Sequence, residues 1–234
     1  MNHAAIREAC CEANLALPRT GLVDLTFGNV SVLDPPAGVF AIKPSGVAYG
    51  ELTPKDMVIV DLEGKVVDGS LKPSSDTPTH CVLFEAFGSS GTTAVVHTHS
   101  RAAVAFAQAG RPLPCLGTTH ADHFDGPVPC TRWLTPEEVA GDYEGETGRV
   151  IVETFETQEV DPVRCPAVLV QGHGPFCWGV NAARALENAM ALEICADLAL
   201  KTLTLQADLQ DLPDALLRKH FDRKHGPAAY YGQG

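Results

Sequence analysis

Residues 93–109 read TAVVHTHSRAAVAFAQA, an apolar run that leads into two histidines and then into an alanine-rich segment. The β-branched and apolar residues favour a strand over Thr93–His97. The spacing of the apolar residues that follow favours a helix over Arg101–Ala109. The two histidines, His97 and His99, are therefore expected where a buried strand ends.

The segments on either side of this strand also show either strand-like apolar runs or helical spacing of apolar residues. Helical spacing predicts a helix after Pro78 as far as Phe87, and a long helix to Leu205 that Asn181 caps at its N-terminus. Further predicted elements are a helix at Ala4–Leu17 and strands at Asn29–Leu33, Val39–Lys43, Met57–Leu62, Lys65–Val67, Ala167–Val170 and Phe176–Gly179. Strands in the middle and helices at both ends indicate an α/β fold, a largely antiparallel sheet covered by helices.

Composition restricts the class of protein. The chain has 234 residues, 45% hydrophobic and 20% charged, and no linker interrupts it, so we predict one domain over residues 1–234. The formal charge of −12 argues against nucleic acid or an anionic membrane as partner. No apolar run reaches about 18 residues and no signal-peptide pattern opens the chain, which predicts a cytoplasmic protein. The eight cysteines form no C-x-x-C pair and are expected to be free, small hydrophobic side chains.

Three histidines form the clearest chemical pattern. His97 and His99 are two residues apart, so on a strand both imidazoles point to the same face. His173 follows an apolar run in the sequence QGHGP, where the flanking glycines let the backbone pass close to a bound ion. Three imidazoles with open positions suit Zn²⁺, Mn²⁺ or Co²⁺. The alternative is three unrelated histidines at strand ends, and the glycine-flanked His173 favours the metal site.

Three polar turns are candidates for binding an anion. Lys72–His80 precedes a predicted helix, and hydroxyl and N–H groups at a helix N-terminus can hold a phosphate. Lys43–Gly46 and Thr26–Asn29 are two further polar turns that contain glycine. A helix-capping segment rich in Ser, Asp and Pro would look similar without any ligand. The three turns, taken with the histidine pattern, favour the phosphate interpretation.

Two more segments offer groups that can exchange protons. Residues 117–123 read GTTHADH, too polar for a core strand, and Asp122 is a candidate acid or base, with a solvated loop aspartate as the alternative. The C-terminal sequence RKHGPAAYYGQG (223–234) places two tyrosines where small polar residues are usual. The tail is therefore expected to dock on another surface, although packing alone could explain the tyrosines.

Taken together, these segments resemble the class II aldolase/epimerase family over nearly the whole chain, from Glu12–Pro18 to Ala229–Gln233. A match of that length is far more specific than two alternating histidines. Its strongest stretches are Thr26–Ser31 apart from Phe27, Ile42–Val47, Lys72–His80, Val96–Arg101, Gly117–Asp122, Val150–Glu156 and Arg223–Gly226. The departures are mild: Phe27 stands where an epimerase often has Trp, Cys177 stands where Ala is frequent, and the turn at Pro35 differs.

The resemblance implies a three-layer α/β/α fold with a mainly antiparallel central sheet. It implies a homotetramer whose active sites lie between neighbouring subunits. It also implies a zinc ion held by His97, His99 and His173, with Asp76 beside the metal as a further ligand. Three imidazoles with open positions leave Mn²⁺ and Co²⁺ as alternatives to zinc.

For the substrate, the resemblance implies a phosphorylated ketopentose. Asp122 and Tyr231 match two proton donors and acceptors, and Tyr231 would reach across from the adjacent subunit. Residues implied to bind the phosphate or to line the shared pocket are Gly28, Asn29, Lys43, Ser45, Gly46, Ser74, Ser75, Thr118, Glu144 and His220.

Within the family, the resemblance implies epimerisation of L-ribulose 5-phosphate to D-xylulose 5-phosphate. C4 is not adjacent to the C2 carbonyl, so its hydrogen is not acidic, and a retro-aldol/aldol route through C3–C4 avoids that problem. A metal would stabilise the negative charge on the three-carbon fragment. L-Arabinose use is the expected setting, although L-ascorbate breakdown uses the same chemistry.

Two alternatives remain for the activity. One is an L-fuculose- or L-rhamnulose-phosphate aldolase, and the family's aldolases tend to carry Glu where this chain has Asp76. The other is a scaffold relative without catalysis. The presence of three histidines together with Asp122 and Tyr231 disfavours the scaffold.

Overall fold

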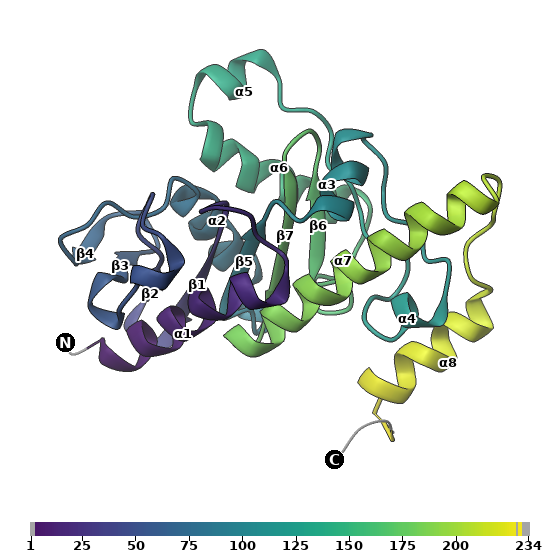
Figure 1. Cartoon of the computed structure of the whole chain (residues 1–234), viewed down its shortest axis with the longest axis horizontal. Helices are drawn as coiled ribbons and strands as arrows, with labels where there is room; N and C mark the ends of the chain where they lie inside the picture. Colours follow the sequence, from purple (N-terminus) through teal and green to yellow (C-terminus); the bar gives the residue numbers. More distant parts are fainter. Residues whose placement is uncertain (1–2, 228, 231–234) are drawn as a thin grey trace.

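The computed structural model describes residues 3–227, 229 and 230 (Figure 1). Its strands are β1 (Gly28–Asp34), β2 (Val39–Ile42), β3 (Val58–Asp61), β4 (Val66–Asp68), β5 (Ala94–Thr98), β6 (Ala167–Val170) and β7 (Gly174–Gly179). They form a seven-stranded sheet in the order β4-β3-β2-β1-β5-β7-β6, and every neighbouring pair is antiparallel. The predicted antiparallel sheet is confirmed.

The described helices surround this sheet. They are α1 (Ala4–Thr20), α2 (Thr77–Phe87), α3 (Arg101–Gln108), α4 (Thr118–Ala121), α5 (Pro136–Ala140), α6 (Tyr143–Thr157), α7 (Ala182–Leu205) and α8 (Asp214–His225). Short 3-10 turns lie at Pro35–Ala37, Tyr49–Glu51, Pro54–Asp56 and Gly88–Ser90. Asn181 caps α7 as predicted, since its side chain accepts a hydrogen bond from the N–H of Arg184 at 2.9 Å.

Successive strand residues point to opposite faces of the sheet, and this alternation builds two cores. Val96 and Leu169 belong to the core that α1, α3 and α7 cover. Val95 and Val168, their neighbours in sequence, belong to the core that α2 and α6 cover. The chain therefore has the predicted three layers, and the long α7 crosses one face of the sheet in Figure 1.

The sequence patterns missed α6, and its glycines explain why. Gly145 and Gly148 lower helix propensity, so the segment does not read as a helix. In the structure, a Cβ atom at Gly148 would lie 2.7 Å from the Cβ of Val82, which belongs to α2. The glycine therefore permits α6 to pack closely on α2, and this contact stabilises the helix despite its low propensity.

The helix α1 also ends later than predicted, at Thr20, with Pro18 inside its last turn. The hydroxyl of Thr20 donates to the carbonyl of Leu17 at 2.6 Å, and Gly21 ends the helix in the left-handed region at φ 75°. A proline near a helix end removes a single N–H bond, and here the chain tolerates it.

The cysteines agree with the prediction that they are free, small hydrophobic side chains. All eight cysteines are free, and seven of them are buried. Among the described helices, none is both long and apolar enough to span a membrane. The helix α8 packs on α4 at the edge of the molecule, beyond the body of the sheet (Figure 1).

Candidate metal centre and active site

The three predicted histidines lie together where β5 ends. The Nε2 atoms of His97 and His99 are 3.1 Å apart, and one nitrogen from each of the three imidazoles lies within 4.8 Å of the others. His97 pairs with Asn29 of β1 and with Phe176 of β7 across the sheet. His173 comes from the turn between β6 and β7, so sheet pairing brings two distant segments to one point.

Neighbouring groups fix the orientation of the imidazoles. The Nδ1 atom of His97 lies 3.0 Å from the carbonyl oxygen of Pro175, so an N–H at Nδ1 leaves the Nε2 lone pair facing the cluster. The ring of Phe176 stacks on His97 at 4.2 Å, and the ring of Phe27 stacks on His99 at 5.7 Å. These contacts hold the nitrogen atoms in position before any ion binds.

The protonation of the cluster suits a divalent cation. Burial lowers the pKa of all three imidazoles, and that of His97 falls to about 3. Neutral imidazole is the form that binds a metal. The Nδ1 atom of His173 is buried and has no partner in the described part of the chain. The three histidines therefore form a site for a divalent metal.

Asp76 stands at the N-cap position of α2, but its side chain makes no capping hydrogen bond. Its carboxylate accepts a hydrogen bond from Nδ2 of Asn29 at 2.6 Å, so the capping alternative does not apply to this residue. Burial acts to raise the pKa of Asp76, but His97, His80, His173 and Asn29 outweigh it, and the pKa is lowered.

A cavity of about 410 Å³ opens beside the histidines. The three predicted polar turns meet there, although they are far apart in sequence. The cavity is lined by Thr26, Phe27, Gly28, Asn29, Lys43, Pro44, Ser45, Gly46, Ser74, Ser75, Asp76, His97, His99, Tyr143, Glu144 and His173. At Gly28, with φ +121°, a Cβ atom would lie 2.8 Å from the carbonyl oxygen of His97, so only glycine lets β1 start this close to the metal cluster.

On the wall of the same cavity, two loops offer hydrogen-bond donors. The N–H of Ser74 donates to the carbonyl of Lys43 at 3.0 Å, and the N–H of Ser45 donates across the same pair of loops at 2.9 Å. In the described residues no protein hydrogen bond engages the hydroxyls of Ser45 and Ser75 or the N–H of Gly46. The ammonium group of Lys43 lies 3.3 Å from the carbonyl oxygen of Pro44, and burial lowers its pKa. This wall can bind an anion.

Other predicted residues lie elsewhere. Thr118 begins α4, Asp122 follows it and bonds His220 of α8, and none of the three lines the histidine cavity. The Asp122 carboxylate accepts hydrogen bonds from Nε and Nη2 of Arg223 at 2.9 and 2.6 Å. Burial acts to raise the pKa of Asp122, but Arg223 and His220 outweigh it, and the pKa is lowered. Tyr231 lies outside the described residues.

Comparison with known proteins identifies the family. A model of the class II aldolase and adducin N-terminal domain matches residues 8–200. The chain belongs to this family. L-ribulose-5-phosphate 4-epimerase UlaF of Salmonella paratyphi C is 51% identical over 228 residues, which are 97% of this chain and 98% of the relative. The protein of the same name from Salmonella typhi has the same identity and coverage.

Solved structures of the family share the fold. An L-fuculose 1-phosphate aldolase superposes with a TM-score of 0.78 at 24% identity, covering 95% of this chain and 97% of the other. The L-fuculose-1-phosphate aldolase of Thermus thermophilus gives a TM-score of 0.65 at 26% identity, covering 89% of this chain and 100% of the other. The class II aldolase fold inferred from the sequence is thereby confirmed.

The sequence patterns missed two aromatic residues of the site. Tyr143 begins α6, lines the cavity, and stacks on His173 with ring centres 6.3 Å apart. It stands next to Glu144, which the family resemblance did indicate, but an aromatic residue at a helix start carries no signal of its own. In the sequence, Phe27 stands out only as a departure from the family pattern. In the structure its ring packs on His99.

Proposed function

We propose that this class II aldolase family member is a metal-dependent L-ribulose-5-phosphate 4-epimerase. The observation that carries the proposal is the single cavity that joins the histidine cluster to the polar turns. Cleavage of a carbon–carbon bond in a sugar phosphate calls for positive charge near the sugar oxygen atoms and for a neutral or positive wall at the phosphate. The names of the curated relatives support the same activity. Zn²⁺ is the metal we propose, with Mn²⁺ or Co²⁺ as alternatives.

The reaction that fits this site breaks and re-forms the C3–C4 bond. Direct removal of the C4 proton is disfavoured because C4 is not adjacent to the C2 carbonyl. The residues proposed to hold the metal are His97, His99 and His173, with Asp76 beside them. When bound, a divalent metal supplies positive charge that stabilises the negative charge developing as C3–C4 breaks.

The polar turns have a separate role in this proposal. Cleavage leaves glycolaldehyde phosphate, which must stay in the site while its aldehyde group turns over. Phosphate binding by Ser45, Gly46 and Ser75 would anchor this fragment, and charge-assisted hydrogen bonds are stronger than neutral ones. Lys43 adds positive charge near this wall. The aldehyde can then rotate and react on its opposite face, which inverts C4.

Inversion also needs proton transfer at the C4 oxygen on both faces of the aldehyde. We assign these roles to Asp122 and Tyr231, with Thr118 and His220 close to the same shared site. Asp122 does not line the histidine cavity of its own chain. We therefore propose a homotetramer in which each active site combines the histidine cavity of one subunit with groups from its neighbour. A heterologous contact of this kind closes into a ring of four subunits when each contact turns the next subunit by a quarter of a full rotation.

The remaining proposals concern the domain organisation of the chain, its cellular compartment and its metabolic role. We propose that residues 1–234 form one domain and that the protein acts in the cytoplasm, where eight free thiols stay reduced. The epimerisation would serve L-arabinose use, and L-ascorbate breakdown requires the same step.

The deciding experiment is turnover of L-ribulose 5-phosphate with and without a chelator. The proposal expects D-xylulose 5-phosphate as product, loss of activity with the chelator, and recovery on adding Zn²⁺. Free glycolaldehyde phosphate as the main product would instead indicate an aldolase. A purified protein that neither binds metal nor turns over the sugar would be a scaffold.

A further inference from the structure

The turn that carries His173 is covered by a side chain outside the cavity. Gly172 has φ +74°, the left-handed region that favours glycine. A Cβ atom built at Gly172 would collide with the six-membered ring of Trp133. The indole therefore packs directly on the backbone of the residue before a metal ligand.

The segment that carries Trp133 is also hydrogen-bonded to residues just before and at the start of that turn. The N–H of Thr131 donates to the carbonyl of Leu169 at 2.9 Å, before the turn. The hydroxyl of Thr131 accepts the N–H of Gln171 at 3.0 Å, within the turn. One backbone hydrogen bond, one hydrogen bond to the Thr131 hydroxyl and one ring contact thus connect residues 131–133 to the turn that presents His173.

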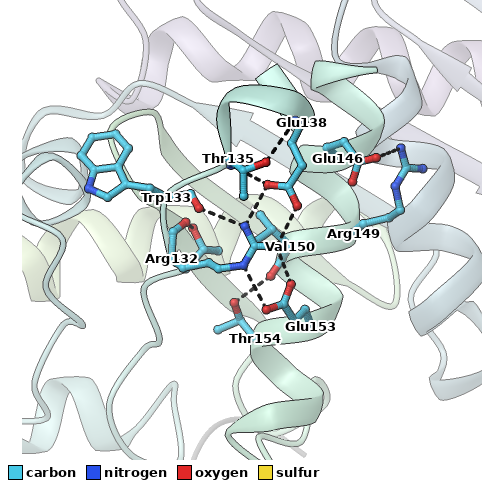
Figure 2. Close-up of polar contacts among 10 residues, drawn as sticks. Arg132, Trp133, Thr135, Glu138, Glu146, Arg149, Val150, Glu153 and Thr154 are labelled. Carbon is cyan, nitrogen blue, oxygen red and sulfur yellow. Dashed lines mark hydrogen bonds and ion pairs between the residues drawn. The ribbon is translucent and has the colours of Figure 1, made fainter. Parts of the chain in front are cut away.

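Arg132 fixes this segment against α6. Its guanidinium donates to both carboxylate oxygens of Glu138 at 2.8 Å and to both of Glu153 at 2.8 and 3.0 Å. It also donates to the carbonyl of Trp133 at 3.0 Å, as Figure 2 shows. Hydrogen bonds from Arg132 lower the pKa of Glu138 to about 2, so the pair stays charged at any physiological pH. Bidentate pairs of this kind fix geometry.

The exposure of these groups indicates what the arrangement does. The Trp133 side chain is 60% exposed, so it adds little to the core. Arg132 is also partly exposed, and exposed ion pairs contribute little to folding stability. What the arrangement determines is the position of the 171–173 turn relative to α6. On α6, the ring of Tyr143 stacks on His173.

We propose that Trp133, fixed by Arg132, is a positioning residue for His173 and sets the affinity of the metal site. Without the indole, the glycine-containing turn must be ordered when the ion binds, and the ordering lowers the affinity. Groups that orient a metal ligand from outside typically change metal affinity 10–100-fold. The inference rests on the histidine metal site and is independent of the sugar substrate.

The test is the dissociation constant for Zn²⁺, measured by competition with a chromogenic chelator on the metal-free folded protein. We expect Trp133→Ala and Arg132→Gln to weaken Zn²⁺ binding about 10-fold or more. Trp133→Phe should keep most of the affinity, because a ring still covers Gly172. Arg149→Gln is the matched control: Arg149 bonds Asp142, the N-cap of α6, and Glu146 on α6. Figure 2 shows its pair with Glu146, and no hydrogen bond joins it to residues 131–133.

Two results would overturn the inference. One is an unchanged Zn²⁺ affinity in Arg132→Gln and Trp133→Ala, or in Arg132→Gln alone if Trp133→Ala does not fold. The other is an equal loss in Arg149→Gln, which would make the effect a general property of α6. In a His173→Asn background, Trp133→Ala should give no further loss of affinity. Because no sugar enters the measurement, a failed epimerase assay leaves this test standing, and a failed test leaves the epimerase proposal standing.

Discussion

Arg223 holds the Asp122 carboxylate through both of its oxygens, with Nε 2.9 Å from one and Nη2 2.6 Å from the other. His220 adds Nδ1 at 3.1 Å, and Nε2 of His225 lies 2.9 Å from the Asp122 carbonyl oxygen. All of these partners belong to α8, whereas Asp122 ends α4. The carboxylate is therefore kept ionised and directed by one helix, and α8 controls the group that we assign to proton transfer.

Arg223→Gln should lower kcat for L-ribulose 5-phosphate at least 10-fold, because proton transfer by a positioned group contributes about 10²–10⁴-fold. If Arg223 acts through Asp122, the two effects are not additive, and Arg223→Gln changes little in an Asp122→Asn background. Steady-state kinetics of the two single variants and the double variant measure this coupling.

Arg164→Gln is the control for this prediction. Arg164 lies over the ring of Phe221 on α8 at 4.5 Å and pairs with Asp125 at 2.7 Å, but it does not contact Asp122. A drop in kcat as large as that of Arg223→Gln would mean that any loosening of α8 suffices, and the specific role of Arg223 would be wrong.

His97→Asn should lose most bound metal and nearly all turnover while the fold survives. His97 is the most buried of the three ligands, and Asn is smaller and has no ring nitrogen to take the place of the imidazole Nε2. Atomic absorption measures the metal content, and circular dichroism measures whether the fold is retained. His123→Asn, outside the cluster, should keep its metal. Stoichiometric metal in His97→Asn would contradict the assignment.

Ser75→Ala should raise KM for L-ribulose 5-phosphate with a smaller effect on kcat. A hydrogen bond to a charged partner is worth about 1.5–3 kcal/mol, which corresponds to a rise in KM of about 10-fold or more. Removing the hydroxyl leaves no protein partner unpaired among the described residues. KM for the sugar without its phosphate should not change, and equal changes for both sugars would place the phosphate elsewhere.

The sequence predicted the strands and the metal ligands because both depend on short patterns. Alternation in Thr93–His97 places Val95 and His97 on one face, and the same alternation in β7 supplies Phe176 beside His97. The contacts that orient the site could not be predicted this way. Arg223 is 101 residues from Asp122, and Trp133 meets Gly172 only because the sheet brings their segments together.

The sequence patterns did not predict α6, because packing in the folded chain overrides its low intrinsic helix propensity. Gly148 makes α6 a weak helix in the sequence, yet the same glycine lets α6 approach Val82 closely. The polar turn before α2 could be read as a cap or as an anion site, and no local rule decides between them. The long-range bond from Asn29 to Asp76 excludes only the capping role of Asp76, whose carboxylate makes no bond to the helix N–H groups, and phosphate binding by this turn stays a prediction.

His120 should make the folded protein less stable as the pH falls. Its side chain is buried, with Nε2 2.8 Å from the carbonyl oxygen of Gly126, and burial lowers its pKa from 6.5 to about 4. Between these values the unfolded chain binds a proton that the folded chain does not, so stability is lost from about pH 6.5 downwards. The loss reaches about 3 kcal/mol near pH 4, since one pKa unit is about 1.4 kcal/mol.

The check is the free energy of unfolding by urea in the presence of a chelator, for the wild-type protein and His120→Gln between pH 7 and pH 4. Every other group is common to the two proteins, and its contribution cancels in the difference. The advantage of the wild-type protein over the variant should shrink towards acidic pH. A difference that stays constant over this range would show that His120 is not the group that titrates.

Mixed oligomers test whether the active site is shared between subunits. His97→Asn destroys the cavity of its own subunit but leaves Asp122 intact, and Asp122→Asn has the opposite effect. If each site combines the cavity of one subunit with Asp122 of its neighbour, random mixing restores about a quarter of the sites, since both partners must be intact. Co-expression with two different tags and purification on both gives the mixed species, and its activity is compared with that of each parent.

Tyr231→Phe mixed with His97→Asn should behave in the same way if Tyr231 also comes from the neighbour. Mixed oligomers that form and remain as inactive as either parent would place Asp122 and the cavity of one subunit in the same active site.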